Sequence, residues 1–380
     1  MISKPNFNKA EQTAINLLRE GKFTELPIKV KEIANIFNNL KIRPYTWFAK
    51  KRGLSLEEVC LFAESEEGCC YYQKKNHKYL ILYNDNIANP GRRRWTIAHE
   101  IGHYVLKHNE LTNKTILSRS SLSNDEYKTF EKEADCFARS LLAPSSILYA
   151  LRKFNAQDIS KWFDLSMLAA VNVLKFFNKG VSLGRRHNPN DPLVKKFENY
   201  IFNINNARRC HRCKHNFISA VSNYCPVCCS KKITNKRVET NMKYDGYELD
   251  EYGRAIKCPR CRNEEITGGN YCKICGVDVI NRCNNIGMDW NGNPVVICNE
   301  IAEGNARYCI SCGHKTTFFE NGLLIPWDEE YKHGKKQEHK SYLEHLDEEA
   351  EQEAEMEHEQ EKERHHDLMM MAMAKTLELE

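Results

Sequence analysis

The chain of 380 residues is long enough for two or more domains, and residues 1–180 alone could build one with a sizeable core. No apolar run approaches the roughly 18 residues that a membrane helix needs. Charged residues interrupt the first 20 positions, which argues against a secretory signal peptide. We therefore expect a soluble, cytoplasmic protein without a membrane contact.

The net charge of +5 hides an uneven distribution. Residues 338–380 carry 15 acidic and 4 basic side chains, a net charge of −11, which leaves +16 for residues 1–337. An acidic tail can bind the chain's own basic part or a basic partner, so the overall charge is a poor guide to partners.

The first 90 residues predict scaffold elements. Apolar residues at helical spacing predict helices over 8–22 and 26–37, and a proline keeps residues 41–45 extended. Two runs of β-formers, 69–73 and 78–84, predict a hairpin. A free edge of this hairpin could pair with an extended substrate, and an ordinary sheet without that role is the alternative.

A His-Glu-x-x-His pattern follows at His99, Glu100 and His103. On a helix the two histidines lie on one face, where their imidazoles can occupy adjacent corners of a zinc tetrahedron. Glu100 is placed to accept a proton from water in metal-assisted peptide hydrolysis. The pattern also arises by chance, with core or surface histidines, so the interpretation needs a third ligand.

A second helix over 129–143, ended by Pro144, predicts that ligand. Glu131 and Asp135 lie one turn apart, so Glu131 can complete the zinc site while Asp135 fixes the tautomer of a ligand imidazole. Glu133 lies on another face and is the rival ligand. A solvated charged face is the remaining alternative for these carboxylates.

The segment between the two ligand helices is not expected to supply a zinc ligand. His108, five residues after His103, faces away from the ligand face and is expected to be a surface or core histidine. Residues 109–126 are polar and are expected to form a loop that borders the cleft.

Further helices are predicted over 147–154 and 157–178. Part of the second region, residues 158–171, has the spacing of a helix-turn-helix. It lacks a basic recognition face, so we expect it to pack rather than to read DNA. Residues 181–206, with prolines and several asparagines, predict a domain linker.

Two strings, WTIAHEIGH at 95–103 and EKEADCFARSLLAP at 131–144, resemble the ImmA/IrrE family of metallo-endopeptidases. The likeness covers roughly residues 8–180, and the chain continues for about 200 residues that the family pattern does not include. The resemblance implies an intracellular zinc-dependent protease of bacteria and their mobile elements that cleaves or inactivates helix-turn-helix repressors. It implies zinc ligands at His99, His103 and Glu131 and a base at Glu100.

Twelve of the 17 cysteines form three groups of four in the second half of the chain. In a long cytosolic chain, Cys-x2-Cys pairs at this spacing predict zinc ribbons, with one structural ion each, rather than disulfides. With the catalytic ion, we expect about four zinc ions. The predicted ligands are Cys210, Cys213, Cys225 and Cys228 in ribbon 1 (207–238), Cys258, Cys261, Cys272 and Cys275 in ribbon 2 (255–278), and Cys283, Cys298, Cys309 and Cys312 in ribbon 3 (281–318).

Five cysteines remain, and simple packing is the expectation for all of them: Cys60, Cys69, Cys70, Cys136 and Cys229. The alternative is that Cys229 or His211 substitutes for a ligand of ribbon 1.

The ribbons differ in charge. Residues 205–238 carry eight basic and no acidic side chains, whereas residues 239–335 carry 11 basic and 15 acidic ones. Nucleic acid is therefore expected to bind only through ribbon 1, if at all, and a protein is the favoured partner of the array.

Together these patterns predict an α+β chain. It consists of a mainly helical, zincin-like peptidase domain with a small sheet, then tandem zinc ribbons, then an acidic tail at 338–380 that is helical or disordered. The favoured function is an intracellular zinc endopeptidase that acts on a repressor-like protein and recognises it through the ribbons. The alternative is a non-catalytic zinc-binding adaptor that acts through the ribbons on protein or nucleic acid. Glu100 argues against it, because a structural site does not need a base beside its ligand.

Overall fold

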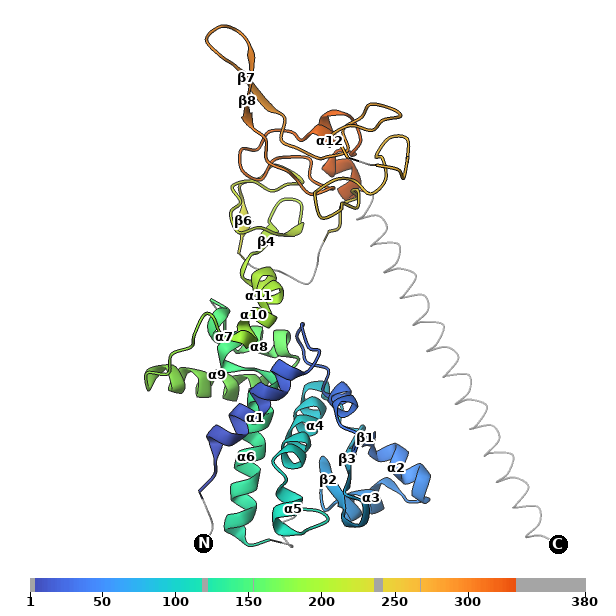
Figure 1. Cartoon of the computed structure of the whole chain (residues 1–380), viewed down its shortest axis with the longest axis vertical. Helices are drawn as coiled ribbons and strands as arrows, with labels where there is room; N and C mark the ends of the chain where they lie inside the picture. Colours follow the sequence, from blue (N-terminus) through green and yellow to red (C-terminus); the bar gives the residue numbers. More distant parts are fainter. Residues whose placement is uncertain (1–3, 118–121, 153, 236–241, 267, 333–380) are drawn as a thin grey trace, which may run out of the picture. The chain divides into compact units, whose positions relative to one another are not determined.

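The computed structural model describes residues 4–117, 122–152, 154–235, 242–266 and 268–332. The chain divides into two compact units, Met1–Asn205 and Asn206–Glu380 (Figure 1). The predicted acidic tail at 338–380 lies outside the described residues. Within the described ranges, no helix is long and apolar enough to cross a membrane. The mixture of helices, small sheets and cysteine groups confirms the α+β class.

The first unit is mainly helical and contains one three-stranded sheet. Its strands are β1 (Leu40–Pro44), β2 (Gly68–Gln73) and β3 (Lys78–Tyr83), and its short 3-10 helices are η1 (Val30–Ile36) and η2 (Lys74–Asn76). Its helices are α1 (Phe7–Glu20), α2 (Tyr45–Arg52), α3 (Leu56–Ala63), α4 (Pro90–Val105), α5 (His108–Thr112), α6 (Asn124–Leu142), α7 (Ser145–Ala150), α8 (Ala156–Phe163), α9 (Met167–Ser182), α10 (Pro192–Lys196) and α11 (Glu198–Asn205).

The sheet has the order β1-β3-β2, with β3 in the centre. β2 and β3 pair antiparallel, with Cys70 opposite Ile81, which confirms the predicted hairpin. β1 pairs parallel with β3. A parallel pair needs a long crossover, and α2, α3 and β2 occupy the chain between β1 and β3.

β2 is an edge strand, but part of its edge is already bonded. The amide of Tyr72 donates to the carbonyl of Thr115 at 2.8 Å, and the side-chain amide of Asn109 donates to the carbonyl of Cys70 at 3.1 Å. The segment that follows α4 therefore covers β2 at these two positions. A substrate strand could pair with β2 there only by displacing this segment.

α4 lies between α6 on one side and the strands β2 and β3 on the other (Figure 1). The core contains Ile97 and Ile101 from α4 and Phe137 and Leu141 from α6, all essentially inaccessible to solvent. Ile81 of β3 belongs to the same core. α4 is thus the element against which both the sheet and the second ligand helix pack.

The prediction of a linker at 181–206 is wrong. Residues 181–205 belong to the first unit and contain α10 and α11. Leu193 and Phe197 are completely buried in the core of that unit. The prolines and asparagines suggested a loop, but Pro192 occupies the first turn of α10, where a proline is tolerated. Apolar residues four apart then anchor the two helices.

One helical prediction nearer the start of the chain needs a small correction. The segment predicted as a helix over 26–37 is a shorter 3-10 helix, η1. Residues 157–178 form two packed helices, α8 and α9, with a turn between them, as the helix-turn-helix spacing of residues 158–171 indicated.

The second unit contains little regular structure. β4 (Ala207–Cys210) pairs with β5 (Asn216–Ile218) and β6 (Ile233–Thr234), and β7 (Asn285–Met288) forms a hairpin with β8 (Pro294–Cys298). A single short helix, α12 (Thr317–Glu320), is present among its described residues. Its apolar clusters are small, and two of them contain cysteines of the predicted zinc sites. Bound metal would therefore be a major source of stability for this unit.

Candidate metal centres

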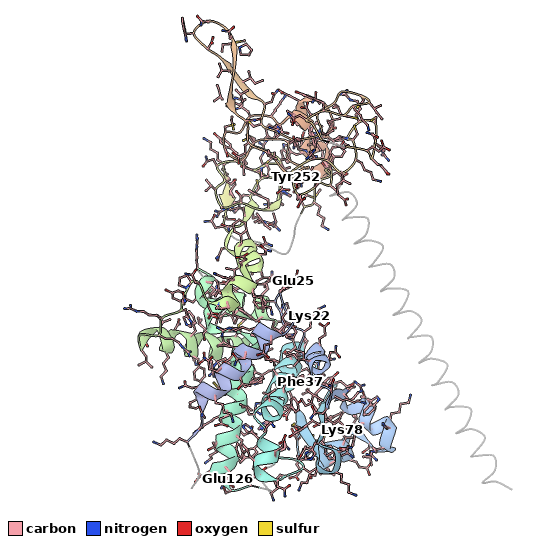
Figure 2. The ribbon with its side chains drawn as sticks, in the orientation of Figure 1. Lys22, Glu25, Phe37, Lys78, Glu126 and Tyr252 are labelled. Atoms are coloured by element: carbon pink, nitrogen blue, oxygen red, sulfur yellow. The ribbon has the colours of Figure 1, made fainter. Side chains whose placement is uncertain are left out.

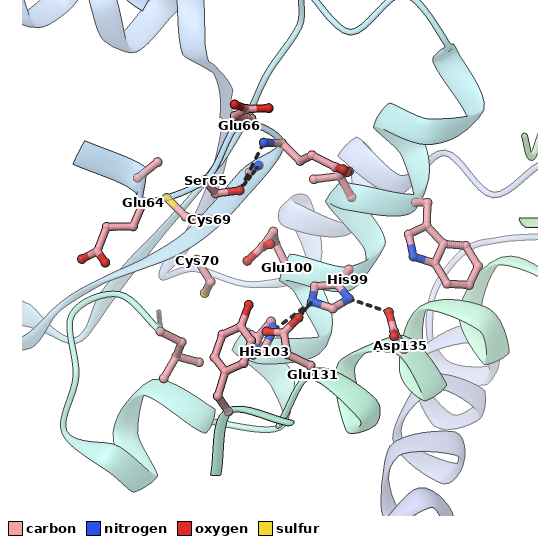
Figure 3. A pocket seen from close by; sticks show the side chains of 17 residues that line it. Glu64, Ser65, Glu66, Cys69, Cys70, His99, Glu100, His103, Glu131 and Asp135 are labelled. Carbon is pink, nitrogen blue, oxygen red and sulfur yellow. Dashed lines mark hydrogen bonds and ion pairs between the residues drawn. The ribbon is translucent and has the colours of Figure 1, made fainter. Parts of the chain in front are cut away.

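Local sequence signals place the two ligand helices. α4 begins with Asn89, whose side chain accepts the amide of Arg92, and Pro90 at the first helical position. α6 begins with a capping box in which Ser123 and Glu126 bond each other's backbone amides. α4 presents His99, Glu100 and His103, and α6 presents Glu131 and Asp135 (Figure 3).

Gly102 allows these helices to approach closely. A Cβ atom at this position would lie 3.1 Å from Cδ1 of Phe137 and 3.2 Å from Cα of Ala134, closer than ordinary van der Waals contact. The glycine inside the His-Glu-x-x-His pattern, directly before His103, therefore lets α6 pack closely against α4. This contact brings Glu131 within reach of both imidazoles.

The three predicted ligands converge. Nε2 of His99 and Nε2 of His103 are 3.0 Å apart, and each lies 3.4 Å from a carboxylate oxygen of Glu131. In a zinc tetrahedron with bonds of about 2.1 Å, two donors are separated by about 3.4 Å. The donor set and its spacing therefore fit a zinc ion, and these residues form one of the four groups that could hold a metal in the described part of the chain.

The other ring nitrogen of each histidine is also hydrogen-bonded. Nδ1 of His99 lies 3.0 Å from Asp135, the residue predicted for this role (Figure 3). Nδ1 of His103 lies 2.9 Å from Nδ1 of His108. Both imidazoles thus direct Nε2 toward the shared point beside Glu131.

His108 is completely buried, and its contact with His103 was not predicted from the sequence. On a continued α4 it would face away from His103. The helix ends at Val105, however, and Lys107 adopts a left-handed conformation with φ of 61°, so α5 folds back toward the site. No glycine marks this reversal, and for that reason the sequence carried no clear signal of it.

Glu133, the rival ligand, points elsewhere. Its carboxylate lies 3.0 Å from Nε2 of His108 and accepts the amide of Asn6 at 2.6 Å. It is not among the donors that converge with His99 and His103.

Two carboxylates beside the histidines have shifted pKa values. Burial raises the pKa of Glu100, against the opposing effect of His103 and His99, and the carboxylate accepts a backbone hydrogen bond from Cys70. Burial also acts to raise the pKa of Glu131, but hydrogen bonds from His103 and His99 outweigh it and lower the pKa overall. Glu131 is therefore held as an anion, whereas Glu100 is the more basic of the two.

A cavity of about 910 Å³ opens over this group. Glu100 lies in its wall beside the histidines, and Asp135 lies at the other side of His99 (Figure 3). Cys69 and Cys70, which were expected only to pack, also line the cavity. Burial raises the pKa of both thiols, so they are neutral.

Comparison with known proteins agrees with this geometry. Residues 65–175 match the family model described as IrrE N-terminal-like domain, Peptidase_M78. Over 102 residues, 26% of the chain, the sequence is 28% identical to a protein of Bacillus subtilis (strain 168) named Metallopeptidase ImmA. Residues 65–175 of the N-terminal unit are thus similar to the ImmA/IrrE family of metallopeptidases. The match spans 56% of the length of the Bacillus protein.

Beyond the ImmA/IrrE-like domain, the cysteines assemble in the three predicted groups. Two sulfur pairs in each group are close: 3.5 and 3.6 Å apart in ribbon 1, 3.5 and 3.6 Å in ribbon 2, and 3.3 and 3.9 Å in ribbon 3. Four thiolates at 2.3 Å from a zinc ion would be about 3.8 Å apart. All 17 cysteines are free thiols, and the geometry of these three groups is one that could hold a metal ion rather than a disulfide.

Five Cys-x2-Cys pairs have the same backbone turn. In each, the amide of the first cysteine donates to the carbonyl five residues later, and the amide four residues later donates back to the carbonyl of the first cysteine, at 2.8–3.1 Å. The residue at that fourth position has a positive φ, between 57 and 78°. These residues are Lys214, Cys229, Arg262, Gly276 and Gly313.

This turn accounts for Cys229. It occupies the left-handed position after Cys228, and its thiol donates to the carbonyl of Gly313 at 3.2 Å instead of joining the ligand group. His211 is exposed and also lies outside that group. Ribbon 3 differs from the others. Its first two cysteines, Cys283 and Cys298, are separated by the hairpin β7–β8 and do not form a Cys-x2-Cys pair.

The repeated turn predicts opposite effects for two substitutions in ribbon 2. Gly276→Ala should destabilise this ribbon by about 1 kcal/mol, and Arg262→Gly should stabilise it by less than that, because only glycine adopts positive φ without strain. Arg260→Gly, at a position without positive φ, is the matched control and should not stabilise. Thermal unfolding of the three variants measures the effect. Equal stability of all three would contradict the assigned strain.

Proposed function

We propose that the protein is a zinc-dependent endopeptidase whose catalytic site comprises His99, Glu100, His103 and Glu131. The observation that carries the proposal is the position of Glu100. Glu100 is only 9% exposed, follows His99 in sequence and lines the same cavity as the three converging donors. A purely structural metal site has no use for a carboxylate held unbonded to the metal beside an open cleft.

Each residue has a distinct role in peptide hydrolysis. His99, His103 and Glu131 hold the ion, and Asp135 holds the His99 ring with Nε2 toward it. Zn²⁺, when bound, supplies Lewis acidity that polarises the scissile carbonyl and lowers the pKa of water. Glu100 accepts the proton of the attacking water on its carboxylate and passes it to the nitrogen of the leaving amine.

The substrate, we propose, is a protein that the second unit helps to recognise. The hairpin β7–β8 projects from that unit, and its side chains stand clear of neighbours (Figure 2). Trp290 is 93% exposed, and Met288 and Ile297 are more than half exposed. No lysine or arginine lies between Cys283 and Cys298. An exposed apolar surface without cations suits a protein partner better than nucleic acid.

By resemblance to the ImmA/IrrE family, a helix-turn-helix repressor is the favoured substrate. The 17 free thiols suit a reducing cytoplasm, where thiolates remain available to zinc. The basic ribbon 1 is the part to which nucleic acid could bind, because it carries eight basic and no acidic residues over 205–238.

The chain truncated after Asn205 should remain folded, bind about one zinc ion and cleave its natural substrate poorly. The first unit has its own core, and ribbon cysteines organise only the second unit. A tethered recognition unit raises the effective concentration of substrate at the cleft, so its loss should appear in KM rather than in kcat. Steady-state kinetics on both proteins measure this. Equal kcat/KM values would show that the second unit does not recognise the substrate.

The substrate and the activity can be tested together with a trap. The full chain carrying Glu100→Gln should retain bound substrate, which copurification and mass spectrometry would identify. The captured protein is then incubated with the wild-type chain, and its new termini are mapped. Cleavage by the wild type supports the proposal. A captured protein that the wild type does not cut would favour the non-catalytic adaptor.

A further inference from the structure

We propose that His108 and Glu133 form a buried hydrogen-bonded chain that positions His103 for the metal. They would be positioning residues, because neither belongs to the group of three converging ligands, and His108 contacts only the nitrogen of His103 that points away from the shared point. The inference rests on the proposed function in one respect, which is the role of His103 as a metal ligand. It assigns a purpose to two polar side chains that the catalytic mechanism itself does not use.

The hydrogen-bonded chain runs without a break from the metal ligand His103 to the N-terminal helix α1. Nδ1 of His103 lies 2.9 Å from Nδ1 of His108, and Nε2 of His108 lies 3.0 Å from Oε2 of Glu133. The other oxygen of Glu133 accepts the amide of Asn6 at 2.6 Å. Asn6 is the N-cap of α1, and its side chain accepts the amide of Lys9. The first turn of α1 thus holds the far end of the chain.

The hydrogen-bond partners determine which ring nitrogen of His103 and of His108 carries a proton. An ionised carboxylate can only accept, so Nε2 of His108 donates to Glu133. In neutral His108 the remaining nitrogen, Nδ1, is then an acceptor, and Nδ1 of His103 must donate to it. This tautomer leaves the lone pair on Nε2 of His103, which faces Nε2 of His99 and the carboxylate of Glu131.

Burial makes the hydrogen-bonded chain behind His103 more rigid than the single hydrogen bond between His99 and Asp135. The side chain of His108 is completely buried, and that of Glu133 is 14% exposed. The ring of Phe130 packs against His108 with centroids 4.5 Å apart. By contrast, the side chain of Asp135, which bonds His99, is 53% exposed. Water can replace a lost partner of His99 more easily than a lost partner of His103.

Three variants of the full-length protein test the proposal. His108→Phe keeps an aromatic ring but removes both nitrogens. His108→Gln retains an oxygen that can accept from Nδ1 of His103. Glu133→Leu leaves His108 in place without its acceptor, and it serves as the main test if His108→Phe does not fold. His77→Gln is the matched control, because His77 bonds Tyr72 and does not contact the metal group.

The readout is zinc affinity, measured by competition with a chelator and followed ion by ion. The three cysteine sites in the same molecule provide an internal reference. We expect His108→Phe and Glu133→Leu to weaken the histidine site about 10- to 100-fold and leave the cysteine sites unchanged. His108→Gln should recover most of the loss, and His77→Gln should behave as wild type.

Two results would overturn the inference. One is unchanged zinc affinity of the histidine site in a folded His108→Phe or Glu133→Leu protein. The other is a loss of equal size in His108→Gln and His108→Phe, which would attribute the effect to packing instead of the hydrogen bond. Either differs from failure of the proposed function, in which the wild-type protein itself would bind no zinc at His99, His103 and Glu131.

Discussion

Glu100→Gln is expected to slow peptide hydrolysis by about 10³-fold with no loss of zinc. The carboxylate accepts a proton from the attacking water, and an amide of the same shape cannot. The side chain is not one of the converging metal donors, so the ion should remain bound. The loss should appear in kcat, with KM little changed, because Gln fills the same space in the cavity wall.

Glu66→Gln is the matched control for this variant. Glu66 lines the same cavity but does not belong to the metal group, so its activity should stay near that of the wild type. Kinetics on a substrate identified by trapping, together with metal analysis of each protein, provide the measurement. Undiminished cleavage by Glu100→Gln would eliminate Glu100 as the base.

Glu131→Ala should weaken zinc binding at the histidine site by more than about 100-fold, and activity should fall with it. Removal of a residue that merely orients a ligand costs 10- to 100-fold, and Glu131 is a ligand in this proposal. The variant also removes the carboxylate that lies 3.4 Å from Nε2 of both His99 and His103. Excess zinc should restore part of the activity, which it cannot do for Glu100→Gln.

Lys132→Ala, at an exposed neighbouring position on α6, is the control for Glu131→Ala. It should bind zinc as the wild type does. If both proteins hold the ion equally well, the third ligand must be another residue.

Much of the site could be predicted because its ligands are close in sequence. A spacing of four places His99 and His103 on one helical face, and Glu131 and Asp135 on another, whatever the rest of the fold does. The same holds for Cys-x2-Cys pairs, whose turn is short and local. The hairpin β2–β3 was predictable for a similar reason, from two runs of β-formers that a short polar segment separates.

What was missed depends on contacts between distant residues. His108 and Glu133 meet because the chain reverses at Lys107 and because α6 packs on α4, and neither event has a local signature. The parallel pairing of β1 with β3 is likewise non-local. The incorrect prediction of a linker at 181–206 shows the opposite problem. There the local prolines indicated a loop, but the burial of Leu193 and Phe197 in the core determines the structure.

The positions with positive φ in the cysteine turns illustrate a third limit. Gly276 and Gly313 are the residues that such a turn favours, but Lys214, Cys229 and Arg262 adopt the same conformation. The two backbone hydrogen bonds of each turn offset the strain at these residues. Sequence propensity alone would have assigned the turn to two pairs out of five.

Zinc content is the most direct test that the chain holds one His₂Glu site and three Cys₄ sites. The wild-type protein should contain about four zinc ions per chain, because each of the four groups in the described residues supplies the donors of one ion. Glu131→Ala, dialysed under the same conditions, should contain about three. Equal zinc content in the two proteins would contradict the assignment of His99, His103 and Glu131 as a metal site.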